Sequence, residues 1–125
     1  MANKKHEWVG LDHVQLAAPP GAEDAARRFF GDLLGMTEVP KPEKLLVRGG
    51  VWFQCGAQFI HIGIESAFAP AKKAHPAFVV QNIESLMEHL QQNDVPIRID
   101  DEIPHLIRFF AEDPFGNRLE FMEAK

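Results

Sequence analysis

The pattern of apolar and polar positions in the first half of the chain predicts a strand, a helix and three further strands. Residues 9–17 alternate in the way typical of a strand, and the sequence Pro19-Pro20-Gly21 ends it. Three short β-like stretches follow near residues 44–48, 51–55 and 58–65. The first half therefore predicts the order βαβββ.

The helix of this half is predicted over residues 22–34. Its apolar side chains recur at helical spacing, and two acidic residues fall in the first turn. Gly35 follows the last apolar position, as is typical at the end of a helix. Pro40 and Pro42 then indicate a loop before the next strand.

The second half repeats the same order. Residues 74–80 predict a strand, and Asn82 is a candidate N-cap for a helix with apolar residues on one face. Three strands follow, over residues 95–99, 106–112 and 117–123. The last two are joined by a Pro-Phe-Gly turn, where we expect Asp113 and Asn117 to have structural roles.

The two halves are offset by about sixty residues, which indicates an internal repeat. His13 in the opening strand of the first half corresponds to His75 in the second. His61 in the closing strand of the first half corresponds to Glu120. We therefore expect an α+β fold of two βαβββ modules that direct equivalent faces towards a shared interior.

The composition is that of an ordinary globular protein, with 46% hydrophobic and 25% charged residues. The length of 125 residues predicts one domain, 1–125, built from modules at about 9–65 and 74–123. A net charge of −5 disfavours nucleic-acid binding, and no apolar stretch approaches the roughly 20 residues that cross a bilayer. Without a signal-type segment, we expect a soluble, cytoplasmic protein.

The residue types available for chemistry are histidine and the carboxylates. The single cysteine, Cys55, has no partner for an internal disulfide or a thiolate metal site. The chain has no tyrosine beside its ten phenylalanines, so acid–base chemistry must come from other groups.

His13, His75 and Glu120 are the candidate metal ligands, because a divalent ion favours imidazole and carboxylate groups that converge from different parts of the backbone. Such a set leaves coordination positions open for substrate and water. His61 is a candidate fourth ligand or a nearby acid or base. One histidine on a strand is more often an ordinary polar residue, but these four residues occupy repeat-equivalent positions.

Other residues are weaker candidates for binding a substrate. Trp52 and Phe59 could line a pocket, although alternating aromatics more often belong to a core. Arginines in strands could bind an anionic group, although a solvent-facing arginine is commoner. The candidate substrate-binding residues are Gln15, Arg48, Trp52, His105 and Arg108.

Five segments carry a resemblance to a known family: LDHVQLA, ARRFFGDLLGM, QFIHIGIE, AHPAFVVQNIESLMEHLQQNDV and RFFAEDPFGNRLEFME. With them the chain resembles the vicinal oxygen chelate superfamily, which includes glyoxalase I, extradiol dioxygenases, fosfomycin-modifying proteins and bleomycin-binding proteins. The resemblance implies paired βαβββ modules that form an incomplete mixed β-barrel. This barrel cups a metal ion, often within a homodimer.

The metal ligands of the family fall on His13, His75 and Glu120. The fourth position, a glutamate in many glyoxalases, falls on His61. The resemblance therefore implies one divalent metal ion per site, Zn, Ni, Mn or Fe(II), with Glu120 and His61 as catalytic groups. The modules pair either within the chain or across a dimer, and the sequence leaves both arrangements open.

The resemblance implies a metal-dependent enzyme that chelates two vicinal oxygens of a small molecule. The reaction is of the lyase or isomerase, dioxygenase or thiol-transfer type. The chain departs from glyoxalase I at His61, and it lacks the tyrosine typical of the fosfomycin-modifying and extradiol relatives. The alternatives are a non-catalytic small-molecule-binding or antibiotic-resistance protein of the same fold, and a purely structural dimer module. Bound metal would distinguish the enzyme from the binding protein.

Overall fold

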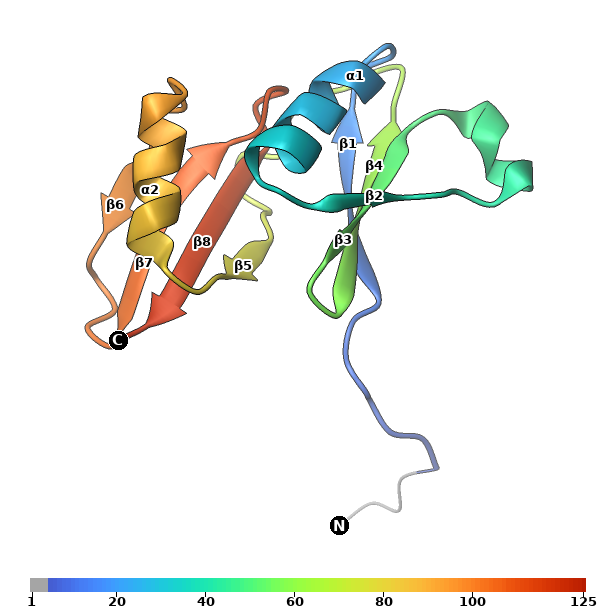
Figure 1. The fold of residues 1–125 in the computed structure, drawn as a ribbon. Helices are drawn as coiled ribbons and strands as arrows, with labels where there is room; N and C mark the ends of the chain where they lie inside the picture. Colours follow the sequence, from blue (N-terminus) through green and yellow to red (C-terminus); the bar gives the residue numbers. More distant parts are fainter. Residues whose placement is uncertain (1–4) are drawn as a thin grey trace.

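The computed structural model describes residues 5–125, and each half of this chain forms one four-stranded sheet (Figure 1). In the first sheet the strand order is β1-β4-β3-β2, and only β1 and β4 run parallel. The bounds of these strands are β1 His13–Ala18, β2 Thr37–Val39, β3 Val51–Cys55 and β4 Gln58–Ile64. The helical segment begins as α1 (Glu23–Ala26) and continues as a π-helix, η1 (Arg27–Leu33).

The second sheet repeats this arrangement, with the order β5-β8-β7-β6 and only β5 and β8 parallel. Its strands are β5 Ala77–Val79, β6 Arg98–Asp100, β7 Leu106–Glu112 and β8 Arg118–Ala124, and its helix is α2 (Ile83–Gln92). Both halves therefore have the order βαβββ. The predicted α+β fold is confirmed, and the two sheets do not close into a barrel.

The strand predicted near residues 44–48 is wrong. This segment is a 3-10 helix, η2 (Glu43–Arg48), and the strand that follows the helical segment is β2. Val39 of β2 pairs with Trp52 of β3, so β2 and β4 occupy both sides of β3. No edge of β3 is left for residues 44–48, and the side chain of Val47 lies exposed.

The N-terminus of α2 is capped from another strand. Asn82 is the N-cap residue, as predicted, but it has a left-handed backbone (φ 62°) and its side chain makes no capping hydrogen bond. The carboxylate of Glu123 in β8 instead accepts hydrogen bonds from the amides of Asn82 and Ile83, both at 3.0 Å. This carboxylate satisfies two amides that the helix itself leaves without partners.

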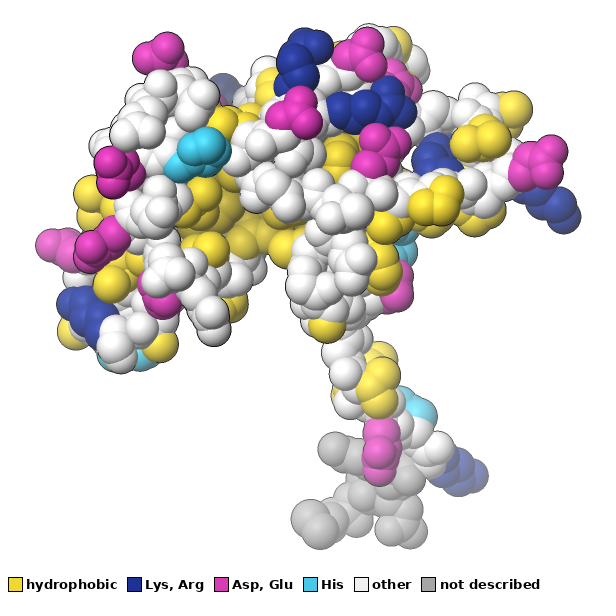
Figure 2. Space-filling view, viewed as in Figure 1, with side chains coloured by type: hydrophobic (Ala, Val, Ile, Leu, Met, Phe, Trp, Pro, Cys, Tyr) yellow, Lys and Arg dark blue, Asp and Glu magenta, His cyan; other side chains and the backbone are white. Residues whose placement is uncertain are grey.

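One continuous cluster of buried apolar side chains spans both halves of the chain. Phe109 and Phe121 stack with ring centroids 5.0 Å apart, and Phe30 packs against Phe53 at 5.8 Å. Figure 2 shows apolar side chains gathered between α2 and the α1–η1 segment. Among residues 5–125, no helix is long and apolar enough to cross a membrane.

Asn117 joins the two halves. Its side-chain amide donates to the backbone oxygen of Ala17 in β1, at 2.8 Å, and accepts from the amide of Ala71, at 3.0 Å. It also donates to the carboxylate of Asp113, which accepts from the amides of Phe115 and Asn117. The structural roles predicted for Asp113 and Asn117 are confirmed.

Candidate functional site

Three stacked rings lie on the first sheet. The ring of His61 in β4 stacks on that of Trp52 in β3 (centroids 3.8 Å apart, planes 3° apart) and on that of His13 in β1 (3.9 Å, 15°). Burial lowers the pKa of His61, and the neighbouring imidazole of His13 lowers it further. This keeps the imidazole of His61 neutral at physiological pH, with a ring nitrogen available as a base or a ligand.

The imidazole of His13 is oriented by the residue before it. Its Nδ1 lies 2.9 Å from Oδ2 of Asp12. A carboxylate that holds one ring nitrogen fixes the orientation of the ring, so that the other nitrogen, Nε2, is free to bind a cation. Asp12 thus makes the contact that commonly supports a metal-binding histidine.

His75, which lies two residues before β5 and not in the strand predicted over residues 74–80, forms the second pair with Glu120 of β8. Nε2 of His75 lies 2.9 Å from Oε1 of Glu120, and its Nδ1 lies 2.9 Å from the backbone oxygen of Lys73. A neutral imidazole has only one N–H group, yet here both ring nitrogens face an acceptor. With a single ring proton, one of these two contacts has no hydrogen, and a metal ion held by His75 and Glu120 would remove this mismatch.

Glu120 is held in turn by Arg108 of β7. The guanidinium of Arg108 donates to Oε2 of Glu120, at 3.1 Å, and to Oδ1 of Asp100, at 3.1 and 3.2 Å. The pKa of Asp100 lies below its ordinary value, because its carboxylate accepts hydrogen bonds from the amide of Glu102 and from Arg108. These contacts turn Oε1 of Glu120 towards His75 and leave Oε2 committed to Arg108.

The four predicted ligands lie in two pairs within one chain. His13 lies beside His61, and His75 beside Glu120, but among residues 5–125 no three His, Cys, Asp or Glu side chains form a group that could hold a metal ion. His13 lines one pocket of about 350 Å³ and His75 another of about 690 Å³, and residues of both β1 and β5 line each pocket.

The donor types fit a divalent metal ion. Each pair offers an imidazole whose Nδ1 is held by an oxygen. Nε2 of His13 is thereby left to coordinate, and Nε2 of His75 lies beside the carboxylate of Glu120. Glu120 adds a carboxylate oxygen and His61 a neutral imidazole. Two or three histidine nitrogens with one carboxylate form a set that suits Zn, Ni, Mn or Fe(II).

The remaining predicted residues lie in different surroundings. Trp52 belongs to the ring stack, and Gln15 is exposed on β1 two residues after His13. Arg48 is exposed on η2, and His105 is exposed on the turn before β7. Arg108 is already engaged by two carboxylates.

Sequence reasoning missed the groups that orient the predicted ligands. Asp12 could have been found, because a carboxylate next to a candidate histidine ligand is a recognisable signal. The backbone oxygen of Lys73 gives no such signal, since any residue type supplies one. The contact between Asp100 and Arg108 depends on the pairing of β6 with β7, which the sequence did not show.

Comparison with known proteins supports one family. The family model of the Glyoxalase/Bleomycin resistance protein/Dioxygenase superfamily matches residues 10–121. A crystal structure from Bacillus anthracis, assigned to the glyoxalase family, is 52% identical, with a TM-score of 0.95 over 98% of this chain and 100% of that one. No match was found among curated proteins.

More distant crystal structures share the fold. A lactoylglutathione lyase from Agrobacterium tumefaciens is 19% identical, with a TM-score of 0.75 over 94% of this chain and 95% of that one. A glyoxalase/dioxygenase from Nostoc punctiforme is 18% identical, with a TM-score of 0.78 over 100% of this chain and 97% of that one. On the family match and the close relative together, the chain belongs to the Glyoxalase/Bleomycin resistance protein/Dioxygenase superfamily.

Proposed function

We propose that the protein is a metal-dependent enzyme that acts on a small molecule by chelating two vicinal oxygens. The observation that carries this proposal is the pair formed by His75 and Glu120. Both nitrogens of the imidazole face oxygen acceptors, and the carboxylate is oriented by Arg108. The pair offers an imidazole and an oriented carboxylate, and membership of the superfamily makes a divalent metal ion the expected ligand.

We propose further that the site is completed by a second copy of the chain. His13 and His61 of one copy would join His75 and Glu120 of the other, because the two pairs do not come together within one chain. Strands β1 and β5 each lie at the edge of their sheet, and residues of both strands line the two pockets to which His13 and His75 belong. A symmetric dimer in which each copy contributes one pair to each site would form two such sites.

The N-terminal segment supports a dimer. Residues 5–12 extend beyond the start of β1 (Figure 1), and the backbone oxygen of Asp12 accepts a hydrogen bond from the amide of Phe59 in β4. Within this segment Trp8 is 88% exposed and Val9 is 99% exposed, and Leu11 is also exposed. A run of large apolar side chains in water is typical of a surface that another chain covers.

The residues of the site have distinct roles in this proposal. A bound divalent ion would polarise the two substrate oxygens and stabilise the negative charge that develops on them. Glu120 offers Oε1 as a ligand or proton acceptor, and Arg108 positions it through Oε2. His61 offers a neutral imidazole nitrogen as the fourth ligand or as the base that accepts a proton.

Metal content tests this proposal. Protein purified without chelators or a His-tag is analysed by inductively coupled plasma mass spectrometry, beside His75→Ala, Glu120→Ala and His89→Ala. We expect about one metal ion per chain in the unaltered protein, loss in the first two variants, and retention in His89→Ala, whose exposed histidine lies on α2 outside the site. Equal loss in all three variants would contradict the ligand assignment. No metal bound or taken up by any sample would favour the non-catalytic binding protein.

A further inference from the structure

Three arginines surround one phenylalanine beside Glu120. The Cζ atoms of Arg118, Arg98 and Arg108 lie 4.3, 4.7 and 5.3 Å from the ring centroid of Phe110. Strand register pairs Phe110 with Glu120 on one side and with Arg98 on the other. Because side chains alternate along a strand, these three paired residues lie on the opposite face of the sheet from the buried Phe109 and Phe121.

Two of these guanidinium groups have N–H donors that no close ion pair uses. Arg108 is committed to Asp100 and Glu120. Among the described residues Arg118 makes no ion pair, and Arg98 has only a 3.9 Å contact with Asp100 and is 62% exposed. Stacking on an aromatic ring uses the flat face of a guanidinium and leaves the N–H groups at its edge available.

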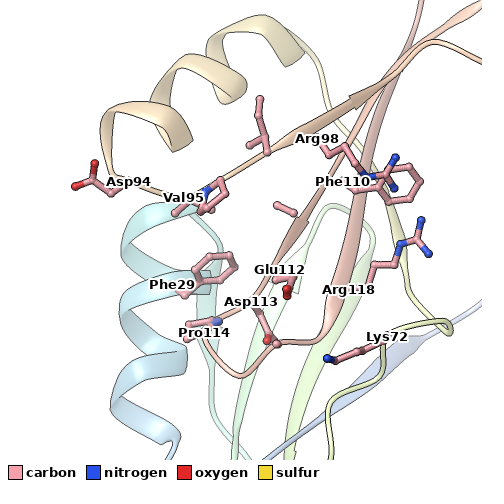
Figure 3. A pocket seen from close by; sticks show the side chains of 14 residues that line it. Phe29, Lys72, Asp94, Val95, Arg98, Phe110, Glu112, Asp113, Pro114 and Arg118 are labelled. Atoms are coloured by element: carbon pink, nitrogen blue, oxygen red, sulfur yellow. The ribbon is translucent and has the colours of Figure 1, made fainter.

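Both arginines line a pocket of about 850 Å³ (Figure 3). Figure 3 shows Phe110 between Arg98 and Arg118, with Lys72 nearby. Acidic residues also line this pocket. The carboxylate of Asp113 is occupied within its turn, and the exposed Asp94 and Glu112 form no ion pair with the basic groups in the described part of the chain. The pocket therefore offers free N–H donors on positive groups.

This pocket adjoins the candidate metal site. The ring of Phe110 contacts that of His75, edge to face, with centroids 5.6 Å apart. Phe110 thus lies next to Arg98 and Arg118 and also next to the pair formed by His75 and Glu120. One small molecule could place its vicinal oxygens at the metal site and a charged end on the arginines.

We propose that Arg98 and Arg118 form an anion-binding subsite for the substrate, which therefore carries a carboxylate or phosphate-type group besides its chelating oxygens. Planar guanidinium groups bind such anions through paired, charge-assisted hydrogen bonds. The location of this subsite within a substrate site rests on the proposed function. The binding of an anion by the two arginines does not.

Titration with inorganic phosphate, and separately with acetate, tests anion binding by the full chain as purified. The side-chain Nε–H signals of the arginines are followed by NMR. We expect saturable shifts at Arg98 and Arg118 with at least one probe, and binding weakened by about tenfold or more in Arg98→Gln and in Arg118→Gln. Arg28→Gln, altered at an exposed arginine on η1 that does not line the pocket, is the matched control and should bind as the unaltered protein does.

The outcomes separate this proposal from the proposed function. The subsite proposal would be overturned if neither probe gave a saturable shift, or if Arg98→Gln, altered at an exposed residue, bound the anion as the unaltered protein does. The metal content would still count as evidence for the enzyme in either case. Loading with Mn(II) should broaden the signals of both arginines, because a paramagnetic ion relaxes nearby nuclei. Anion binding without such broadening in metal-loaded protein would overturn the assignment of the subsite to the same substrate.

Discussion

At the scale of single residues, His75 is the most informative side chain, because both of its ring nitrogens face acceptors. The internal repeat in the sequence predicted which histidines and which glutamate are candidate metal ligands. It could not predict the backbone oxygen of Lys73 or the orientation of Glu120 by Arg108, since these contacts form only when strands come into register. Which of these residues bind metal stays a prediction.

Asp12 should strengthen metal binding although it is not a predicted ligand. In Asp12→Ala the Nδ1 of His13 loses the carboxylate that orients it, so we expect metal affinity to fall by about tenfold or more. Calorimetric titration with Zn(II) measures this change. Asp32→Ala, altered at an exposed aspartate on η1, is the control. The same affinity in Asp12→Ala and the control would contradict an orienting role for Asp12.

At the scale of elements, the local pattern predicted the helices well and the short strands less well. Helix α2 lies where the apolar spacing placed it, and residues 22–34 match α1 and η1. Strand β2 has only three residues, too few to show a period, and it exists because β3 offers it an edge. The apolar residues 44–48 have a strand-like composition, but no strand pairs with them.

Glu123 should stabilise helix α2 from outside the helix. Its carboxylate accepts from the amides of Asn82 and Ile83, so Glu123→Ala would leave both without this partner. We expect the free energy of unfolding to fall by about 1 kcal/mol. Urea unfolding followed by circular dichroism measures it. Glu84→Ala, which alters an exposed acidic residue in the first turn of the helix, should lower the free energy of unfolding by less. Equal losses would contradict the capping role.

At the scale of the whole molecule, the repeat in the sequence predicted two similar sheets but not how they meet. The junction depends on contacts between residues far apart in the chain, such as the hydrogen bond from Asn117 to the backbone oxygen of Ala17. The sequence indicated that Asn117 shapes its own turn, but no local pattern reveals a partner 100 residues away. That the chain folds as one domain stays a prediction.

Asn117 should therefore matter to both halves of the chain. Asn117→Ala removes the partners of a backbone oxygen in β1 and of the Ala71 amide, in a buried place. We expect the free energy of unfolding to fall by about 2–4 kcal/mol, with a single cooperative transition in the unaltered protein. Urea unfolding followed by tryptophan fluorescence and by circular dichroism tests this. Two separate transitions in the unaltered protein would contradict the prediction that the halves fold together.

The central claim is that two copies of the chain build each metal site, and mixing two inactive variants tests it most directly. His13→Ala and Glu120→Ala should each bind no metal alone. In a mixed dimer, one site would carry both substitutions and the other would be intact. When the two variants are refolded together in equal amounts, about half of the dimers are mixed, so the mixture should bind about one metal ion per four chains. Metal content of the mixture, measured by inductively coupled plasma mass spectrometry, gives the answer. A mixture that binds no more metal than either variant alone would contradict the account, because a site built within one chain cannot be repaired by its partner.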